Sequence, residues 1–347
     1  MQTEFRLRTR LRGLADGTAT ALAVLFTLIV ILPLIAIFVY LIIKGASSLN
    51  LAFFTKVPAP VGEEGGGMAN AIVGSAVLLA LASIIGIPIG IGGGIYLAEY
   101  GRGAKLANAI RFTADVLNGV PSIVMGLAAY AILVLRTYSF HLPRFFFHYI
   151  INMHFFYVNQ HLPSGEVIRS YYGMIDLLRI FMDVQGDATG YLFSFGGHFS
   201  GLSGGVALGI MMIPTVCRTT EEMLLMVPHA VREAALGLGV PNWRSVLSIT
   251  VKTASPGIIT GCMLAFARVA GETAPLIFTA LGNQFWSTSL NEPIAALPLQ
   301  IYVYALSPYD DWHRLAWAGA LVLIVLIVLA VSLVRYVTSR GVLKGAS

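Results

Sequence analysis

The sequence PHAVREAALGLGVPNW, residues 228–243, separates two apolar stretches and decides how the rest of the chain is interpreted. Residues 229–238 favour a helix, because Ala, Arg, Glu and Leu are strong helix formers. Gly239 is typical of the left-handed residue that closes a helix, and Pro241 prevents the helix from continuing. Asn242 is expected to cap a second short helix. The pattern predicts two short helices joined by a glycine turn, which would present a rigid, partly apolar surface to another protein, unlike an ordinary connecting loop.

Composition places the chain in a membrane. Its 347 residues are 57% apolar and only 11% charged, a balance typical of a polytopic membrane protein and not of a soluble enzyme. The two cysteines, Cys217 and Cys262, are expected as small buried side chains, and not as a disulfide or a metal site. The net charge of +5 is no sign of nucleic-acid binding, because the basic residues cluster around the apolar runs.

Long apolar runs predict an all-α fold with six transmembrane helices. Residues 18–43 form a first run that is too long for the core of a signal peptide, so we expect an uncleaved span after a cytoplasmic segment, 1–17. A periplasmic loop, 44–70, then leads to a five-helix core, 71–336, and a cytoplasmic tail, 337–347. The other expected spans are 71–96, 113–135, 202–217, 256–281 and 315–336.

The distribution of Lys and Arg predicts that both termini lie in the cytoplasm. With six spans and an internal N-terminus, fourteen of the 22 basic residues fall in inner segments, seven fall in outer segments, and Arg268 falls inside a span. This excess follows the positive-inside rule. The same orientation puts residues 218–252 in the cytoplasm.

Two local features predict how the spans pack and bend. Gly86, Gly90 and Gly94 recur every four residues and line one helix face, so a neighbouring backbone can approach closely. The glycines at 90, 92, 93 and 94 are not a phosphate-binding loop, because no Gly-Lys-Ser/Thr follows them and they lie within an apolar run. Pro121 removes a helix hydrogen bond in the third span, and we expect a bend there. Such a bend either serves packing alone or lines a cavity.

Two motifs give the chain a family resemblance. Glu233-Ala234-Ala235, with Gly239 six positions after the Glu, resembles the EAA loop of ABC importer permeases. Val251-Lys252 stands where that family usually has Leu-Pro. The run ARVAGETAPLIFTALGNQFW, residues 267–286, is narrower and resembles the phosphate importer permeases of the PstA type. The fold that this resemblance implies is that of a type I ABC importer (MetI-like) permease.

The resemblance also implies partners and a mechanism. An ATP-binding subunit dimer would hydrolyse ATP, a homologous second permease would complete the pathway, and a periplasmic or extracellular phosphate-binding protein would deliver phosphate. The chain itself would be no enzyme, would hold no cofactor and would cross the bacterial inner membrane several times. Glu233, Ala234, Ala235 and Gly239, in the coupling loop 218–252, would contact the ATPase, whose closure would drive alternating access.

Charged residues inside the fifth expected span are candidates for the translocation pathway. Arg268 and Glu272 are four residues apart, so on a helix they would share a face and could pair. Arg268 would lie near the middle of that span, where a charge that faces lipid is costly. One interpretation is a structural ion pair between spans. The other, which the resemblance favours, places Arg268, Glu272, Thr273 and the bend at Pro121 at the pathway.

Residues 136–200 form an insertion that related permeases lack. Its aromatic run is too short to cross a membrane, and its Tyr, Phe and His content suits a membrane interface. We expect a periplasmic segment that touches the binding protein or the second permease; a tolerated surface elaboration is the alternative. A metal site would require the four histidines His141, His148, His154 and His161 to converge, and no Cys or close His pair supports it.

Two other functions stay open from the sequence. The first is a permease of the same superfamily for another oxyanion, sulfate or molybdate. The second is an integral membrane enzyme, for which the chain offers Glu272 and several histidines but no metal-ligand cluster or nucleophile within its spans.

Overall fold

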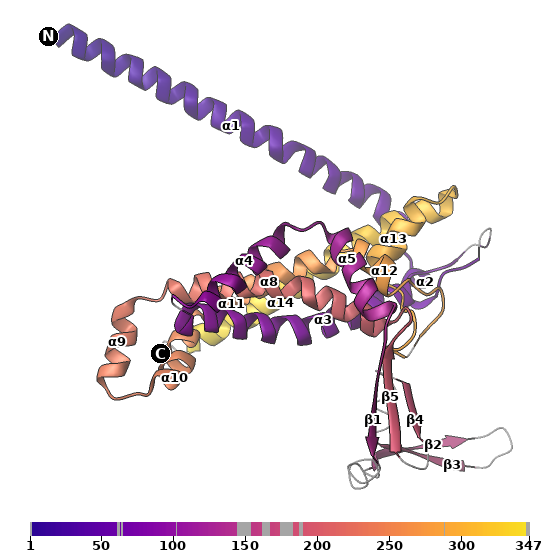
Figure 1. Ribbon diagram of the computed structural model, residues 1–347. Helices are drawn as coiled ribbons and strands as arrows, with labels where there is room; N and C mark the ends of the chain where they lie inside the picture. Colours follow the sequence, from indigo (N-terminus) through magenta and orange to yellow (C-terminus); the bar gives the residue numbers. More distant parts are fainter. Residues whose placement is uncertain are drawn as a thin grey trace.

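The structure is a computed structural model that describes residues 2–344, apart from 61–62, 64, 102, 144–153, 162–166, 174–182, 187–189 and 288. The described part is a helical bundle whose two ends differ (Figure 1). The short helices α9 (His229–Gly237) and α10 (Asn242–Ser245) lie at one end with the C-terminal end of α14, and α2 (Leu51–Thr55), α12 (Ala274–Thr279) and α13 (Leu297–Ala305) lie at the other.

Five helices are long and apolar enough to cross a membrane, and a sixth crossing is possible if one sharply bent pair counts as a span. This agrees with the expected six-span, helical fold. The long helices are α1 (Gln2–Ala46), α3 (Ala69–Ile95) with the π-helical turn η1 (Tyr96–Tyr100), α8 (Gly201–Leu225), α11 (Val251–Ala270) preceded by the π-helical turn η3 (Val246–Thr250), and α14 (Asp310–Lys344). The bent pair is α4 (Lys105–Gly119) and α5 (Ser122–Ala129), the latter extended by η2 (Tyr130–Val134).

Helices α3 and α8 form the centre of the bundle, and the predicted glycine face is where they meet. A Cβ added at Gly86 would lie 2.9 Å from the Gly209 carbonyl oxygen, and one at Gly94 would lie 2.5 Å from Thr220 Cβ. Real Cβ atoms do not approach so closely, so the two helix backbones are as near to each other as glycine allows. The prediction of a close contact is confirmed.

Helix α8 is longer than the sequence suggested. The expected fourth span ended at Cys217, but the helix continues to Leu225 and buries Glu221. The prediction treated the charges after Cys217 as the start of a cytoplasmic loop. Arg218 and Glu221 stay in the helix because partners on α4 neutralise them, as described below.

The predicted bend at Pro121 is confirmed. Helix α4 ends at Gly119 and α5 begins at Ser122, and the two axes meet at 110°. Pro121 cannot donate the backbone hydrogen bond that a continuous helix requires. Behind this break, a Cβ on Gly126 would lie 2.8 Å from Pro275 Cα, so α5 packs tightly against the start of α12.

The fifth span differs from the prediction of a single helix over 256–281. The candidate span is Asn242–Ala270, and the chain leaves the helical path at Gly271 before resuming as α12. Arg268 therefore lies in the last helical turn and not near the middle of a span. The start was misplaced because Pro256 was taken as a boundary, whereas it lies inside α11.

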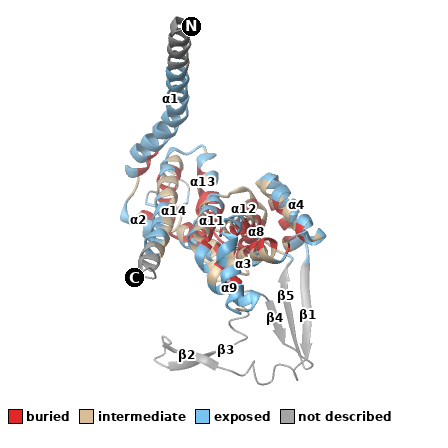
Figure 2. Ribbon diagram, turned by 90° about the vertical axis from the view of Figure 1, so that its left-hand side faces the viewer, coloured by how far each residue is buried: buried red, intermediate tan, exposed pale blue. Residues whose placement is uncertain are grey.

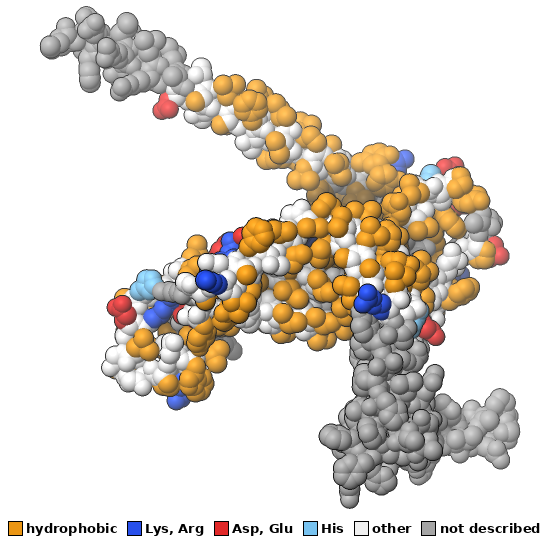
Figure 3. Space-filling model, in the orientation of Figure 1, with side chains coloured by type: hydrophobic (Ala, Val, Ile, Leu, Met, Phe, Trp, Pro, Cys, Tyr) orange, Lys and Arg blue, Asp and Glu red, His pale blue; other side chains and the backbone are white. Residues whose placement is uncertain are grey.

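Helix α1 diverges from the bundle (Figure 1). Its last turns contact α14: the ring of Tyr40 meets the edge of Trp317, and a Cβ on Gly45 would lie 2.8 Å from the Trp317 carbonyl oxygen. Elsewhere its described side chains are exposed, whereas buried residues concentrate in the bundle (Figure 2). Hydrophobic side chains cover the described part of α1 and the visible flank of the bundle, and charged ones gather toward the ends of the bundle (Figure 3).

The insertion contains β-strands that the all-α prediction did not include. Strand β5 pairs antiparallel with both β1 and β4, and β2 pairs antiparallel with β3. The helical prediction therefore holds for the membrane part, and these strands depart from it. The bounds are β1 (Thr137–Pro143), β2 (His154–His161), β3 (Val167–Gly173), β4 (Asp183–Gly186) and β5 (Gly190–Gly196).

Candidate functional site

The helix α9, the turn after it and α10 form a projecting surface at one end of the bundle. Glu233 and Ala234 are exposed on α9, as is Gly239 in the turn. Apolar side chains are exposed around them, a pattern that marks a binding surface more often than a free one. These side chains are Leu236, Leu238, Trp243 and Leu247.

Gly239 closes α9 as the sequence predicted. Its φ is +78°, in the left-handed region that favours glycine. The Gly239 amide donates to the Leu236 carbonyl (2.9 Å) and the Val240 amide to the Ala235 carbonyl (3.2 Å). These two bonds form a Schellman motif, which satisfies the carbonyls at the end of a helix.

Two details of this surface differ from expectation. Ala235 is only 3% exposed, so it packs within the chain and does not join Glu233 and Ala234 on the open face. Asn242 is the first residue of α10 and not its cap; the capping residue is Pro241, whose carbonyl accepts from the amides of Arg244 and Ser245. The proline pre-sets the backbone angle at that position, which a side-chain cap cannot do.

Arg232 connects α9 to the bundle. Its Nη2 lies 2.9 Å from Glu99 Oε1, on η1, and donates to the Leu224 carbonyl of α8 at 2.6 Å. Both side chains are largely buried, at 11% and 8% exposure. Burying a charge is costly unless it is paired, and here each ion meets its counter-ion.

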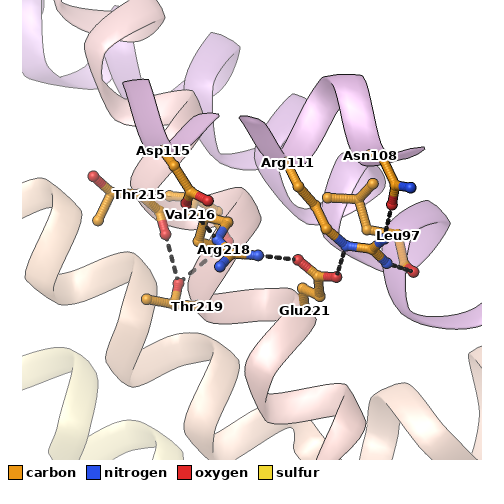
Figure 4. Close-up of polar contacts among 9 residues, drawn as sticks. All are labelled: Leu97, Asn108, Arg111, Asp115, Thr215, Val216, Arg218, Thr219 and Glu221. Carbon is orange, nitrogen blue, oxygen red and sulfur yellow. Dashed lines mark hydrogen bonds and ion pairs between the residues drawn. The ribbon is translucent and has the colours of Figure 1, made fainter. Parts of the chain in front are cut away.

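A second set of charges joins α4 to α8 (Figure 4). Glu221 is buried and accepts from two arginines: Arg111 Nε at 2.6 Å and Arg218 Nη1 at 2.7 Å. Arg218 Nε also lies 2.9 Å from Asp115, and Arg111 donates to the carbonyl oxygen of Leu97 at 2.8 Å. Two positive and two negative groups cancel, so the cluster fastens the α4 half of the bent span to α8 without leaving a net charge.

Arg268 and Glu272 do not form the ion pair that their spacing allows on a helix. The helix ends between them, at Ala270. Arg268 is exposed, and among the described residues it has no side-chain hydrogen bond and no ion-pair partner; the same holds for Glu272, which is half-buried beside Thr273. Pro121 is exposed at the other helix break, where α5 packs on α12.

Sequence reasoning missed the buried charges. It placed Arg218 and Glu221 in the cytoplasmic segment 218–252 and gave no role to Arg111 or Glu99. One signal was available: Arg218 and Glu221 are three residues apart, a spacing that pairs charges on a helix. Their partners on α4 had no such signal, because Arg111 and Glu221 are 110 positions apart.

The four histidines that a metal site in the insertion would require lie outside the described side chains. His148 lies outside the described residues, and the side chains of His141, His154 and His161 on β1 and β2 are not described. Among the described residues no group of three or more His, Cys, Asp or Glu side chains could hold a metal ion.

Comparison with known proteins gives consistent matches. Residues 90–341 match the family model of the binding-protein-dependent transport system inner membrane component. The chain is 41% identical over 297 residues to a phosphate transport system permease protein PstA of Yersinia pestis, covering 86% of this chain and 81% of that protein. It is 38% identical to a PstA of Haemophilus influenzae over 96% of both chains.

A solved structure, a chain of the MetNI methionine ABC transporter in an inward-facing conformation, is 16% identical with a TM-score of 0.49, covering 80% of this chain and 96% of that one. The family model and the long alignments carry the assignment. The chain belongs to the binding-protein-dependent transport system inner membrane components and, among them, to the PstA phosphate transport permeases.

Proposed function

We propose that the chain is the membrane-spanning permease subunit of an ATP-driven importer of inorganic phosphate in the bacterial inner membrane, with both termini in the cytoplasm. The observation that carries the proposal is the α9–Gly239–α10 surface, which projects from a bundle of membrane spans and exposes Glu233 beside apolar side chains. An ABC importer permease works with an ATP-binding subunit and a substrate-binding protein. We further propose that the ATP-binding subunit is a dimer that binds this surface, and that a homologous second permease lies beside the spans.

In this proposal α9 and its turn receive the ATPase. Glu233 and Ala234 contact it directly, and Gly239 sets the angle between α9 and α10. Ala235, which is buried, holds α9 against its own chain instead. The chain has no catalytic role; ATP binding and hydrolysis belong to the partner.

Arg268 is the proposed contact for phosphate. A guanidinium grips a phosphate with two parallel hydrogen bonds, and here its donors are exposed and have no partner among the described residues. An exposed arginine in the last turn of α11, beside the helix break at Gly271, is suited to a water-filled pathway or to a partner subunit at this face. Glu272 and Thr273 follow at the helix break, where non-helical backbone can line such a pathway.

The missing Arg268–Glu272 pair weighs against a purely structural role for these charges, because a lock between spans requires the two side chains to meet. Phosphate is favoured over sulfate or molybdate by the PstA assignment. The oxyanions share their tetrahedral shape, so a direct competition experiment separates them.

The test uses the complete transporter in proteoliposomes, with labelled phosphate uptake and ATP hydrolysis measured together. Wild type should take up phosphate, and excess sulfate or molybdate should compete poorly. Arg268→Lys should assemble yet lose about 10²-fold or more in phosphate uptake, since the single ammonium of lysine cannot donate the two parallel hydrogen bonds of a guanidinium. Arg335→Lys, an exposed arginine near the end of α14, is the matched control and should transport normally.

Full uptake by an assembled Arg268→Leu, Glu272→Leu double variant would refute the pathway role. Preferential uptake of sulfate or molybdate would refute the substrate. Failure of the chain to assemble with any ATPase would refute the permease function itself.

A further inference from the structure

The contacts of Arg232 join three elements that are far apart in the sequence. Arg232 lies on α9, Glu99 on the π-helical end of α3, and Leu224 in the last turn of α8. Helix α9 is therefore bonded to the ends of two spans. Its covalent connections lead only to α8 and, through α10 and η3, to α11. The ion pair between Arg232 and Glu99 connects α9 to α3 as well.

Helices α3 and α8 are the pair best suited to move as one body. At Gly90 an added Cβ would lie 2.6 Å from Val216 Cβ, and at Gly94 one would lie 2.7 Å from the Cys217 carbonyl oxygen. Backbones packed at this distance cannot slide past each other without a clash. A displacement that enters at Glu99 and Leu224 is thus shared by both spans.

The surroundings of the Arg232–Glu99 pair favour a role in transmitting movement between helices over a purely structural contact. Two of the three spans that reach α9, namely α3 and α11, do so through the π-helical turns η1 and η3, and such turns are frequent at functional sites. Buried Arg232 Nε and Glu99 Oε1 have no hydrogen-bond partner among the described residues, although Nη2 and Oε1 are in ion-pair contact. The pair is held by charge and by the Leu224 bond, and not by a full set of hydrogen bonds, so it can reorient without losing its attraction.

We infer that Arg232 and Glu99 are positioning residues that transmit the movement of α9 to the α3–α8 body, so that ATP hydrolysis by the partner is converted into opening and closing of the spans. This inference rests on the proposed function, in which α9 receives the ATPase. It assigns a role to residues outside both the exposed face of α9 and the proposed pathway.

The measured quantity that separates transmission from simple stabilisation is the number of phosphate ions taken up per ATP hydrolysed. Glu99→Gln keeps the size of the side chain and removes its charge. We expect the complex to assemble and hydrolyse ATP, with uptake per ATP reduced about tenfold. Arg232→Gln should show the same loss, and the double variant should be no worse than either single one, because all three break the same link.

Glu222→Gln is the matched control. Glu222 lies on α8 beside Glu221, is exposed, and loses the same charge, so its uptake per ATP should equal that of wild type. An unchanged ratio in Glu99→Gln would overturn the inference. So would a loss of assembly or thermal stability that accounts for the whole defect, since the pair would then only hold the fold.

The outcome for wild type separates this inference from the proposed function. If the wild-type complex hydrolyses ATP and takes up phosphate but Glu99→Gln keeps the wild-type ratio, only the transmission role fails. If wild type shows neither coupled hydrolysis nor uptake, the permease function fails first.

Discussion

Helices α1 and α8 are both long enough to cross a membrane, yet the more apolar of the two is the one that is not buried in the protein. The most apolar stretch of α1 has a mean hydropathy of 3.1 and none of it is buried, whereas that of α8 has a mean hydropathy of 1.3 and 61% of it is buried. In water the more apolar helix would be the core. In a bilayer lipid tails are as apolar as leucine, so there is no hydrophobic force to bury such a helix.

What brings α8 to the centre is close packing and polar pairing. Its small residues meet the glycine face of α3, and its charges find partners on α4. Polar groups in a membrane part must be satisfied within the protein, which ties such a helix to its neighbours. Four predictions test this contrast, beginning with the largest expected effect.

Glu221→Gln should have the largest effect on stability. It leaves Arg111 and Arg218 without the buried carboxylate that joins them. Breaking a buried pair typically costs about 3–5 kcal/mol. The free energy of unfolding, or the thermal midpoint of the purified complex, should fall accordingly. Asp115→Asn removes an acid of the same cluster that is 55% exposed and should cost much less. Equal losses would show that burial does not set the value of these charges.

Gly94→Ala should also destabilise the bundle. The new methyl would lie 2.5 Å from Thr220 Cβ, so α3 and α8 must separate. Overpacking of this kind typically costs about 1–3 kcal/mol. At Gly92, on the same helix, nothing lies within 4 Å of an added Cβ, and Gly92→Ala should be neutral or slightly stabilising. If thermal unfolding found the two variants alike, the close α3–α8 contact would be wrong.

Gly239→Val should act on coupling more than on stability. A non-glycine residue at φ +78° costs about 1–2 kcal/mol, and no neighbouring atom would clash. The turn between α9 and α10 should distort, so that the ATPase fails to bind or hydrolyses ATP without phosphate uptake. Gly237→Val adds the same side chain with open space around it and without the positive φ. Co-purification of the ATPase and uptake assays would compare them; normal transport by Gly239→Val contradicts the assigned surface.

Val30→Leu should have the smallest effect. Val30 lies on α1 and is 73% exposed, so an added methylene meets lipid and should change stability by less than about 0.5 kcal/mol. The same change at buried Val216, on α8, should cost about 1–3 kcal/mol. Thermal unfolding of the assembled transporter is the measurement. A loss at Val30 as large as that at Val216 would show that a partner subunit covers α1 as closely as the bundle covers α8.

The sequence by itself determined the features that depend on local pattern. The apolar runs predicted the membrane class and six helical spans. The spacing of Gly86, Gly90 and Gly94 predicted a close contact, Pro121 a bend, and Gly239 a left-handed turn. Each follows from the conformational limits of glycine or proline or from the periodicity of a helix, so no knowledge of distant residues was required.

Only the tertiary structure decided which charges are buried and where they act. Nothing near Glu221 indicates that Arg111, 110 positions away, would keep it inside an extended α8. The same holds for Glu99 and Arg232, for the buried face of Ala235, and for the end of α11 at Ala270, which separates Arg268 from Glu272. The physical reason is that the cost of a charge or a helix break depends on its surroundings, and those are supplied by segments that the local sequence does not contain.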